Sequence, residues 1–170
     1  MLLAAAVSAT RVDADGFGTS ANPDHYVADG MPHTYASTES TASEKITMEA
    51  WFNGRMTTQY DQRTDMTILS VGYTSFTDAY WYITTAVGTA DATCMNLLAG
   101  NICERVRIRF NTTWAASQTT NEKRQGACHE IGHSVGFDDS IPEVATGCMS
   151  GGGLGVLSAH EIGHINDQYP

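Results

Sequence analysis

Alternation of polar and apolar residues marks the predicted strands of this chain. Arg105 to Phe110 alternates strictly, so its three apolar residues should face a core while the arginines face outward. Such an arginine row can form a basic binding face, but it is more often a solvated sheet surface that discourages pairing with other chains. Three further stretches have the β-branched and aromatic content of strands, namely residues 33–35, 66–73 and 78–84.

Three helices are predicted by a capping pattern, in which Ser or Thr at the helix start is followed three residues later by Glu. The pattern occurs at Thr41–Glu44, Thr119–Glu122 and Ser158–Glu161. The first helix should run to about Tyr60, and the residues available for its buried side are Ile46, Met48, Trp51, Phe52 and Met56. In the second helix an apolar face recurs every four residues, at Ala127, Ile131 and Val135.

The polar side of the second helix carries the candidate chemistry, a run from His129 to Asp139 with the pattern HExxHxxGxxD. Residues four apart lie about 40° apart around a helix axis, so His129 and His133 can direct two imidazoles at one metal ion. Glu130 lies beside them, where it can accept a proton from a metal-bound water. A surface helix with two unrelated histidines is the alternative, and chance does not readily produce the full pattern.

Gly136 falls where this helix should end, and glycine tolerates the left-handed conformation that reverses a chain. The reversal can bring an aspartate back as a third ligand. Asp138 and Asp139 are adjacent, so either can serve, and the spacing favours Asp139. Three protein ligands and one open position are typical of a catalytic zinc site rather than a structural one.

With Met149 downstream, this pattern resembles the metzincin clan of zinc endopeptidases, and it is similar to snapalysin and to small actinobacterial matrixin-like secreted proteases. The likeness rests on residues 128–149 and extends loosely to 64–66 and 77–82. It implies an α+β fold with a twisted sheet, an active-site helix, a methionine turn at Met149 beneath the zinc and a C-terminal helix. It also implies a monomer that cleaves protein or peptide substrates. Most metzincins have histidine as the third ligand, at the position of Asp139. An aspartate at this position is a feature that the chain shares with snapalysin.

Four cysteines, an even number, indicate two disulfides and an oxidising compartment, with three pairings open. Cys94 with Cys103 would close a short loop between two strands. In the fold that the resemblance implies, Cys128 with Cys148 would tie the zinc helix to the methionine turn, and this is the expected pairing. The rival interpretation makes Cys128 a metal ligand, which is awkward because its side chain points about 100° away from that of its neighbour on a helix.

Length and charge limit the class of protein. At 170 residues we expect one domain over 30–170, after an irregular arm over 10–29. Residues 1–9 resemble a signal peptide that lacks its basic start, or they form an apolar arm. The net charge of −10 argues against binding nucleic acid or anionic membranes, and no apolar run is long enough to span a membrane. With the cysteines, a secreted, extracellular protein is expected.

Two functions from different classes follow. The first is a secreted zinc-dependent endopeptidase with Glu130 as general base, in which an exposed strand, Tyr80–Thr84, pairs with an extended substrate. The second is a catalytically silent secreted domain of the same fold that binds zinc or protein. The intact Glu130 argues against the second function, because zinc binding alone does not require a base.

A second HEIGH sequence, from His160 to His164, is expected to be structural and to hold no catalytic zinc. Glu161 already has a role in the capping pattern at the start of its helix. Pro170 stands where a third ligand should fall, and Asp167 stands where the turning glycine should be. A metal ion at this sequence would have to use His160, His164 and Asp167.

Overall fold

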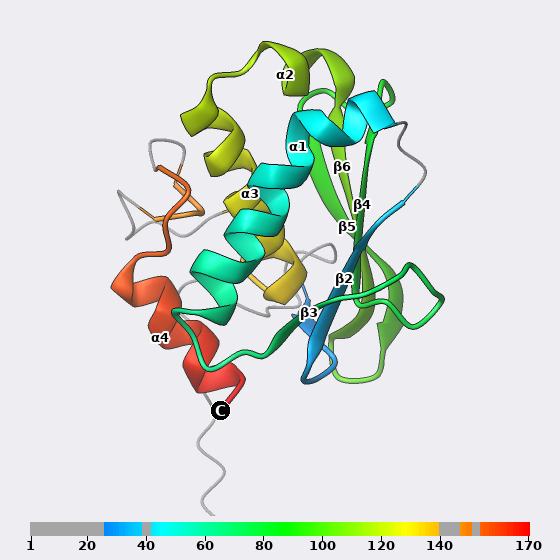
Figure 1. Ribbon diagram of the computed structural model, residues 1–170. Coiled ribbons are helices and arrows are strands. Elements are labelled where there is room, and N and C mark those ends of the chain that lie inside the picture. Colours follow the sequence, from blue (N-terminus) through cyan, green and yellow to red (C-terminus); the bar gives the residue numbers. More distant parts are fainter. Residues whose placement is uncertain (1–25, 39–41, 140–146, 151–153) are drawn as a thin grey trace, which may run out of the picture.

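Helices pack against one face of a mixed sheet in the computed structural model of this protein, which describes residues 26–38, 42–139, 147–150 and 154–170 (Figure 1). The strands are β1 (Val27–Ala28), β2 (His33–Ser37), β3 (Ile68–Ser70), β4 (Ala79–Thr84), β5 (Ala90–Leu98) and β6 (Ile102–Asn111). The helices are α1 (Ala42–Arg55), continued by the π-helical turn η1 (Met56–Asp61), α2 (Thr112–Ser117), α3 (Thr120–Val135) and α4 (Ala159–Gln168). This mixture of helices and a largely parallel sheet is compatible with the α+β prediction. None of these helices is long and apolar enough to cross a membrane.

Strand β6 is the centre of the sheet, whose order is β1-β6-β4-β2-β3 with β5 alongside β6. Among the described strands only β5 is antiparallel to its neighbour. It pairs along nearly all of β6, from Ala90 opposite Phe110 to Leu98 opposite Ile102, and no other described strand pairs with it. β5 is therefore an edge strand.

The prediction that Tyr80–Thr84 is an exposed strand for substrate pairing is wrong. β4 lies between β2 and β6, and both of its edges are paired. Trp81 of this strand is fully buried. The sequence shows the strand character of these residues but not their neighbours, because strand order depends on contacts between distant segments. Among the described strands, the edges that remain available include that of β5, which pairs only with β6, and that of β3, which pairs only with β2.

The hydrophobic core lies between the sheet and α1. As the alternation predicts, Val106, Ile108 and Phe110 of β6 are at most 2% exposed. Phe52 of α1 packs against this layer, with its ring centre 5.2 Å from that of Trp81 and 6.2 Å from that of Phe110. Met48, Phe52 and Met56 are thus buried as expected, whereas the side chain of Ile46 lies outside the described part.

The arginines of β6 face outward, and two of them have partners on the same surface. Arg109 donates from Nε to Asp91 Oδ1 at 2.8 Å, and the guanidinium of Arg105 lies 5.9 Å from the centre of the Tyr80 ring. These contacts join neighbouring strands. They support the interpretation of a solvated sheet surface rather than a binding face.

The prediction of an irregular arm over 10–29 is wrong at its C-terminal end. Val27–Ala28 forms β1, which runs parallel to β6 at Ile102 and Cys103. A strand of two residues has no periodicity that a sequence can show. The earlier part of the arm, the signal-like residues 1–9 and the predicted cap at Thr41 lie outside the described residues.

A tyrosine near the C-terminus fastens β1 to α3. The backbone N–H of Ala28 donates to Tyr169 Oη at 2.8 Å, and this hydroxyl donates to the carbonyl of Val135 at 2.7 Å. Tyr169 is buried. The last residue of α3 is thus connected to both ends of the described chain.

Other predicted elements differ in extent. The strand expected over 66–73 is limited to Ile68–Ser70, where it pairs with β2. The first helix ends close to the predicted position, but its last turn, η1, is π-helical. The short helix α2 was not predicted. Asn111 caps it by accepting from the N–H of Trp114.

The two expected disulfides are present. Cys94–Cys103 joins β5 to β6 with Cα atoms 5.8 Å apart, and Cys128–Cys148 joins α3 to the turn around Met149 with Cα atoms 5.3 Å apart. Cys128 is therefore not a metal ligand, because its sulfur is in the second of these bonds.

We expect acid to destabilise the fold through His33. This side chain is fully buried, and its Nε2 lies 3.3 Å from Ser134 Oγ, which itself donates to Ile131 O. Burial lowers the pKa of His33 to about 4. The unfolded chain takes up this proton near pH 6.5, so stability is lost as the pH falls from about 6.5 towards 4, by at most about 3 kcal/mol.

Urea unfolding at several pH values measures this effect. The variant His33→Gln cannot be protonated, so its free energy of unfolding should fall less over the same pH range. Equal pH dependence in both proteins would contradict the role of His33.

Candidate metal centre

Helix α3 positions the HExxH residues, and both of its ends form as predicted. At its start, Thr119 Oγ1 accepts from the N–H of Glu122, while Glu122 Oε2 accepts from the N–H of Thr119. At its end, Gly136 has φ of 118°, a left-handed conformation that favours glycine. A Cβ at Gly136 would also lie 3.2 Å from the Cα of Val27 in β1. The reversal at Gly136 returns the chain towards the helix.

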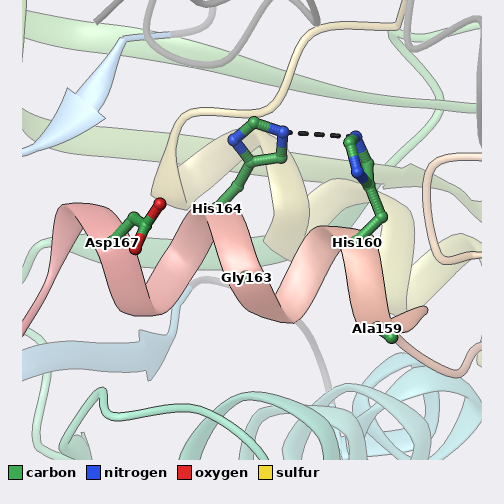
Figure 2. Close-up of a pocket in the computed structure, with 5 residues that line it drawn as sticks. All are labelled: Ala159, His160, Gly163, His164 and Asp167. Atoms are coloured by element: carbon green, nitrogen blue, oxygen red, sulfur yellow. Dashed lines mark hydrogen bonds between the residues drawn. The ribbon is translucent and has the colours of Figure 1, made fainter.

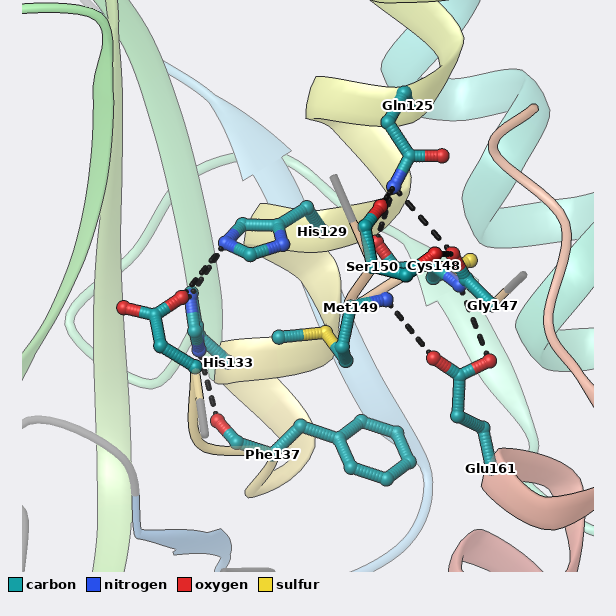
Figure 3. A network of polar contacts seen from close by, with 10 residues as sticks. Gln125, His129, His133, Phe137, Gly147, Cys148, Met149, Ser150 and Glu161 are labelled. Carbon is teal, nitrogen blue, oxygen red and sulfur yellow. Dashed lines mark hydrogen bonds and ion pairs between the residues drawn. The ribbon is translucent and has the colours of Figure 1, made fainter. Parts of the chain in front are cut away.

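Three potential ligand atoms converge beside α3 (Figure 3). His129 Nε2 lies 3.0 Å from His133 Nε2 and 3.0 Å from Asp139 Oδ1, and His133 Nε2 lies 3.3 Å from the same oxygen. His133 is buried, whereas the side chain of Asp139 is 64% exposed. Among the described residues this is the one group of three that can hold a metal ion, and Asp138 lies outside it.

These separations fit a zinc ion. Ligand atoms about 2.0–2.1 Å from zinc at angles of 90–110° are about 2.9–3.4 Å from one another, and the three observed separations lie in that range. Two imidazoles and a carboxylate are also common zinc ligands. The residues present therefore fit a metal ion of this kind.

A hydrogen bond orients the ring of His133. Its Nδ1 lies 2.8 Å from the carbonyl oxygen of Phe137, and a carbonyl can only accept, so Nδ1 carries the proton. The lone pair of the neutral ring is then on Nε2, the atom that faces His129 and Asp139. Histidines that bind metals are commonly oriented in this way.

Charges within the group are strongly coupled. Hydrogen bonds from His129 and His133 hold the pKa of Asp139 well below its ordinary value. Burial alone would lower the pKa of His133, but the hydrogen bond to Asp139 and the nearby Glu130 charge raise it above its ordinary value. The group therefore favours positive charge between its three ligand atoms, which a metal ion can supply in place of a proton.

Glu130 is a buried carboxyl beside the two histidines. It is 6% exposed, and burial raises its pKa to about 7 against the opposing effect of His133 and His129. Its Oε2 has no hydrogen-bond partner in the described part of the chain. A buried carboxyl with an unpaired oxygen can accept a proton from a polar molecule that enters the site.

Met149 packs beneath the helix, and its side chain extends towards the imidazoles (Figure 3). A Cβ at Gly132 would lie only 2.3 Å from Met149 Sδ. Gly132, between the two histidines, therefore leaves the space that the methionine fills. This contact gives the glycine of the first HEIGH a packing role.

Glu161 of the second HEIGH holds the turn that carries Met149. Its carboxylate accepts from the backbone N–H of Cys148 at 3.1 Å and of Met149 at 2.8 Å (Figure 3). It also accepts from the backbone N–H of Ser158 at 2.7 Å. A Cβ at Gly147 would overlap this carboxylate. The predicted capping role of Glu161 is confirmed. Its contact with the methionine turn was not foreseen, because the capping pattern describes only local contacts.

Gln125 holds the same turn from the other side, and sequence reasoning missed it. Its Nε2 donates to the carbonyls of Cys148 at 2.5 Å and Ser150 at 2.6 Å, and its Oε1 accepts from the N–H of Gly155 at 2.8 Å. Gln125 lies four residues before His129 on α3. That spacing was the only signal in the sequence, since it places both side chains on one face of the helix.

We expect Asp139, rather than Asp138, to be required for metal binding. Asp139→Ala removes one of the three converging ligand atoms and should lose most bound zinc, whereas Asp138→Ala should retain it. Metal content after dialysis against buffer with trace zinc measures the difference. Stoichiometric zinc in the Asp139 variant together with loss in the Asp138 variant would reverse the assignment.

The structure thus brings together the predicted ligand residues, the predicted base and the predicted methionine. Residues 151–153, after the methionine turn, lie outside the described part.

No protein-family model matches this chain, and no curated protein is significantly similar to it in sequence.

Proposed function

We propose that this protein is a secreted zinc-dependent endopeptidase of the metzincin type. The observation that carries the proposal is the convergence of His129, His133 and Asp139 beside the buried carboxyl of Glu130, whose Oε2 has no hydrogen-bond partner among the described residues. A zinc ion held by these three residues would polarise a peptide carbonyl and make a water molecule more acidic. A site that only stores metal does not need a carboxyl such as that of Glu130 beside the three ligand residues.

Each residue of the site has a defined task in this proposal. His129, His133 and Asp139 hold the ion, and the Phe137 carbonyl orients His133. Glu130 takes the proton of the attacking water and passes it to the leaving amine. A neighbouring cation would lower the pKa of Glu130 from about 7, so the carboxylate form would be present at neutral pH.

The edge of β5 replaces β4 as the proposed substrate-binding strand. Its backbone has no partner strand on the outer side among the described strands, so an extended peptide can pair with it. β5 also lies near the site, since it contacts α3, the helix that carries Glu130. Exposed Met95, Leu97 and Leu98 provide apolar surface along the same strand.

We expect the purified protein to cleave casein or gelatin. Cleavage should stop when a zinc chelator is added and should resume when zinc is returned. His129→Ala should be inactive under all three conditions, which controls for contaminating proteases. Stoichiometric zinc without any cleavage would instead indicate the silent binding domain. A protein that binds no zinc at all would contradict the peptidase function and would leave only a silent domain that binds protein.

The proposed secreted location has a separate consequence. Both disulfides should be complete in protein recovered from the culture medium, and the two disulfides should each contribute about 2–4 kcal/mol to the free energy of unfolding. Non-reducing peptide mapping checks the pairing. Free thiols in the secreted protein would count against an oxidising compartment.

A further inference from the structure

Helix α4 presents a second pair of histidines four residues apart on its exposed side (Figure 2). The Nε2 atoms of His160 and His164 lie 3.2 Å apart. Their ring centres are 4.6 Å apart at an interplanar angle of 86°, the same values as for His129 and His133. The two pairs therefore have one geometry in two settings, one next to the buried Glu130 and one at the surface.

The separation of the two nitrogens suits chelation. Two imidazole nitrogens about 2.1 Å from one ion, at an angle of about 100°, are about 3.2 Å apart. His160 and His164 have this separation without any rotation of their side chains. A metal ion here would join consecutive turns of α4.

The surface around the pair is open to an approaching ion. Both histidines line a shallow hollow of about 280 Å³ whose other lining residues are Ala159, Gly163 and Asp167. Glycine weakens a helix, and an added Cβ at Gly163 would meet no other atom within 4 Å, so packing does not require it there. Because Gly163 has no side chain, space is left next to the rings of His160 and His164. Gly132 of the first HEIGH differs, because it makes room for Met149.

Charge also favours a cation at this place. Asp167 follows His164 by three residues, which places it on the same side of α4. The chain as a whole has a net charge of −10. Both features raise the local concentration of cations.

The second HEIGH is nevertheless not a second catalytic centre. Glu161 is fully buried, and its carboxylate is engaged with the backbone N–H groups of the methionine turn. Among the described residues, the three-atom ligand group occurs only at His129, His133 and Asp139. The α4 pair therefore offers two nitrogen ligands and no adjacent base.

We propose that His160 and His164 chelate a second divalent transition-metal ion, such as Zn²⁺ or Ni²⁺, with water completing the coordination. The site is non-catalytic and binds more weakly than a three-ligand group. It does not depend on whether the His129 group supports peptidase activity.

Equilibrium dialysis of the metal-free full chain against increasing Ni²⁺ tests the proposal. The wild-type protein should bind two ions in two affinity classes. The double variant His160→Ala, His164→Ala should lose the weaker class alone, and His129→Ala should lose the tighter class alone. Gln168→Ala, on the same helix, is the matched control and should retain both.

Nuclear magnetic resonance of the wild-type protein provides a second measurement that needs no variant. Paramagnetic Ni²⁺ added after the first equivalent should further broaden the ring signals of His160 and His164. An undiminished weaker class in the double variant, or unbroadened His160 and His164 signals, would overturn the proposal. If the tighter class is absent from the wild type while the weaker one depends on His160 and His164, the α4 site stands and the proposed function fails.

Discussion

Glu130→Gln should leave zinc binding and the fold intact while it removes nearly all peptidase activity. Loss of a general base typically reduces the rate about 10²–10⁴-fold. The amide has almost the same shape as the carboxyl but cannot take a proton from water at neutral pH. Because Glu130 is not one of the three converging ligand residues, the metal content should not change.

Single-turnover cleavage of a fluorogenic peptide, with zinc measured on the same sample, tests this prediction. Glu122→Gln makes the same chemical change in the same helix, but at an exposed position in the capping box, and should keep its activity. Activity near that of the wild type in Glu130→Gln would remove Glu130 from the mechanism. Loss of zinc would show that the residue serves the metal rather than the reaction.

Glu161→Ala should be the most destabilising single substitution near the site. It removes a fully buried carboxylate and leaves the backbone N–H groups of Cys148, Met149 and Ser158 without their acceptor. Each unsatisfied buried donor costs about 1–3 kcal/mol, so a total loss above about 3 kcal/mol is expected. The turn under the imidazoles should loosen, and zinc affinity should fall with it.

Urea unfolding and zinc competition with a chromophoric chelator measure the two effects. Glu161→Gln is the milder variant, since one oxygen remains to accept, and it should lie between wild type and Glu161→Ala in stability. Gln168→Ala, which changes an exposed residue of the same helix, is the control. Equal stability of Glu161→Ala and Gln168→Ala would mean that the turn is held mainly by Gln125 and the disulfide.

The local features of this protein could be predicted because their causes are local. The caps at Thr119 and Ser158, the left-handed Gly136 and the spacing of His129 and His133 each depend on residues within one or two helical turns. The ligand group followed from these features, since a helix and a reversal fix where three nearby side chains meet.

The features that could not be predicted join distant segments. Strand order made β4 internal and β5 an edge strand, although both have strand-like residues. The contacts of Gln125 and Glu161 with the methionine turn use backbone atoms, which carry no sequence signal of their own. The short strand β1 exists only through its pairing with β6.

The hydroxyl of Tyr169 has a practical consequence for handling the protein. It accepts from β1 and donates to the last residue of α3, one position before the reversal at Gly136. Proteolysis that removes Tyr169 would therefore release the end of the helix that carries the proposed metal ligands, although none of these residues is lost. A preparation cleaved in this way should bind metal less tightly, so intact-mass analysis should accompany every activity assay. An affinity tag close to Tyr169 is compatible with the fold only if this side chain can still turn inward.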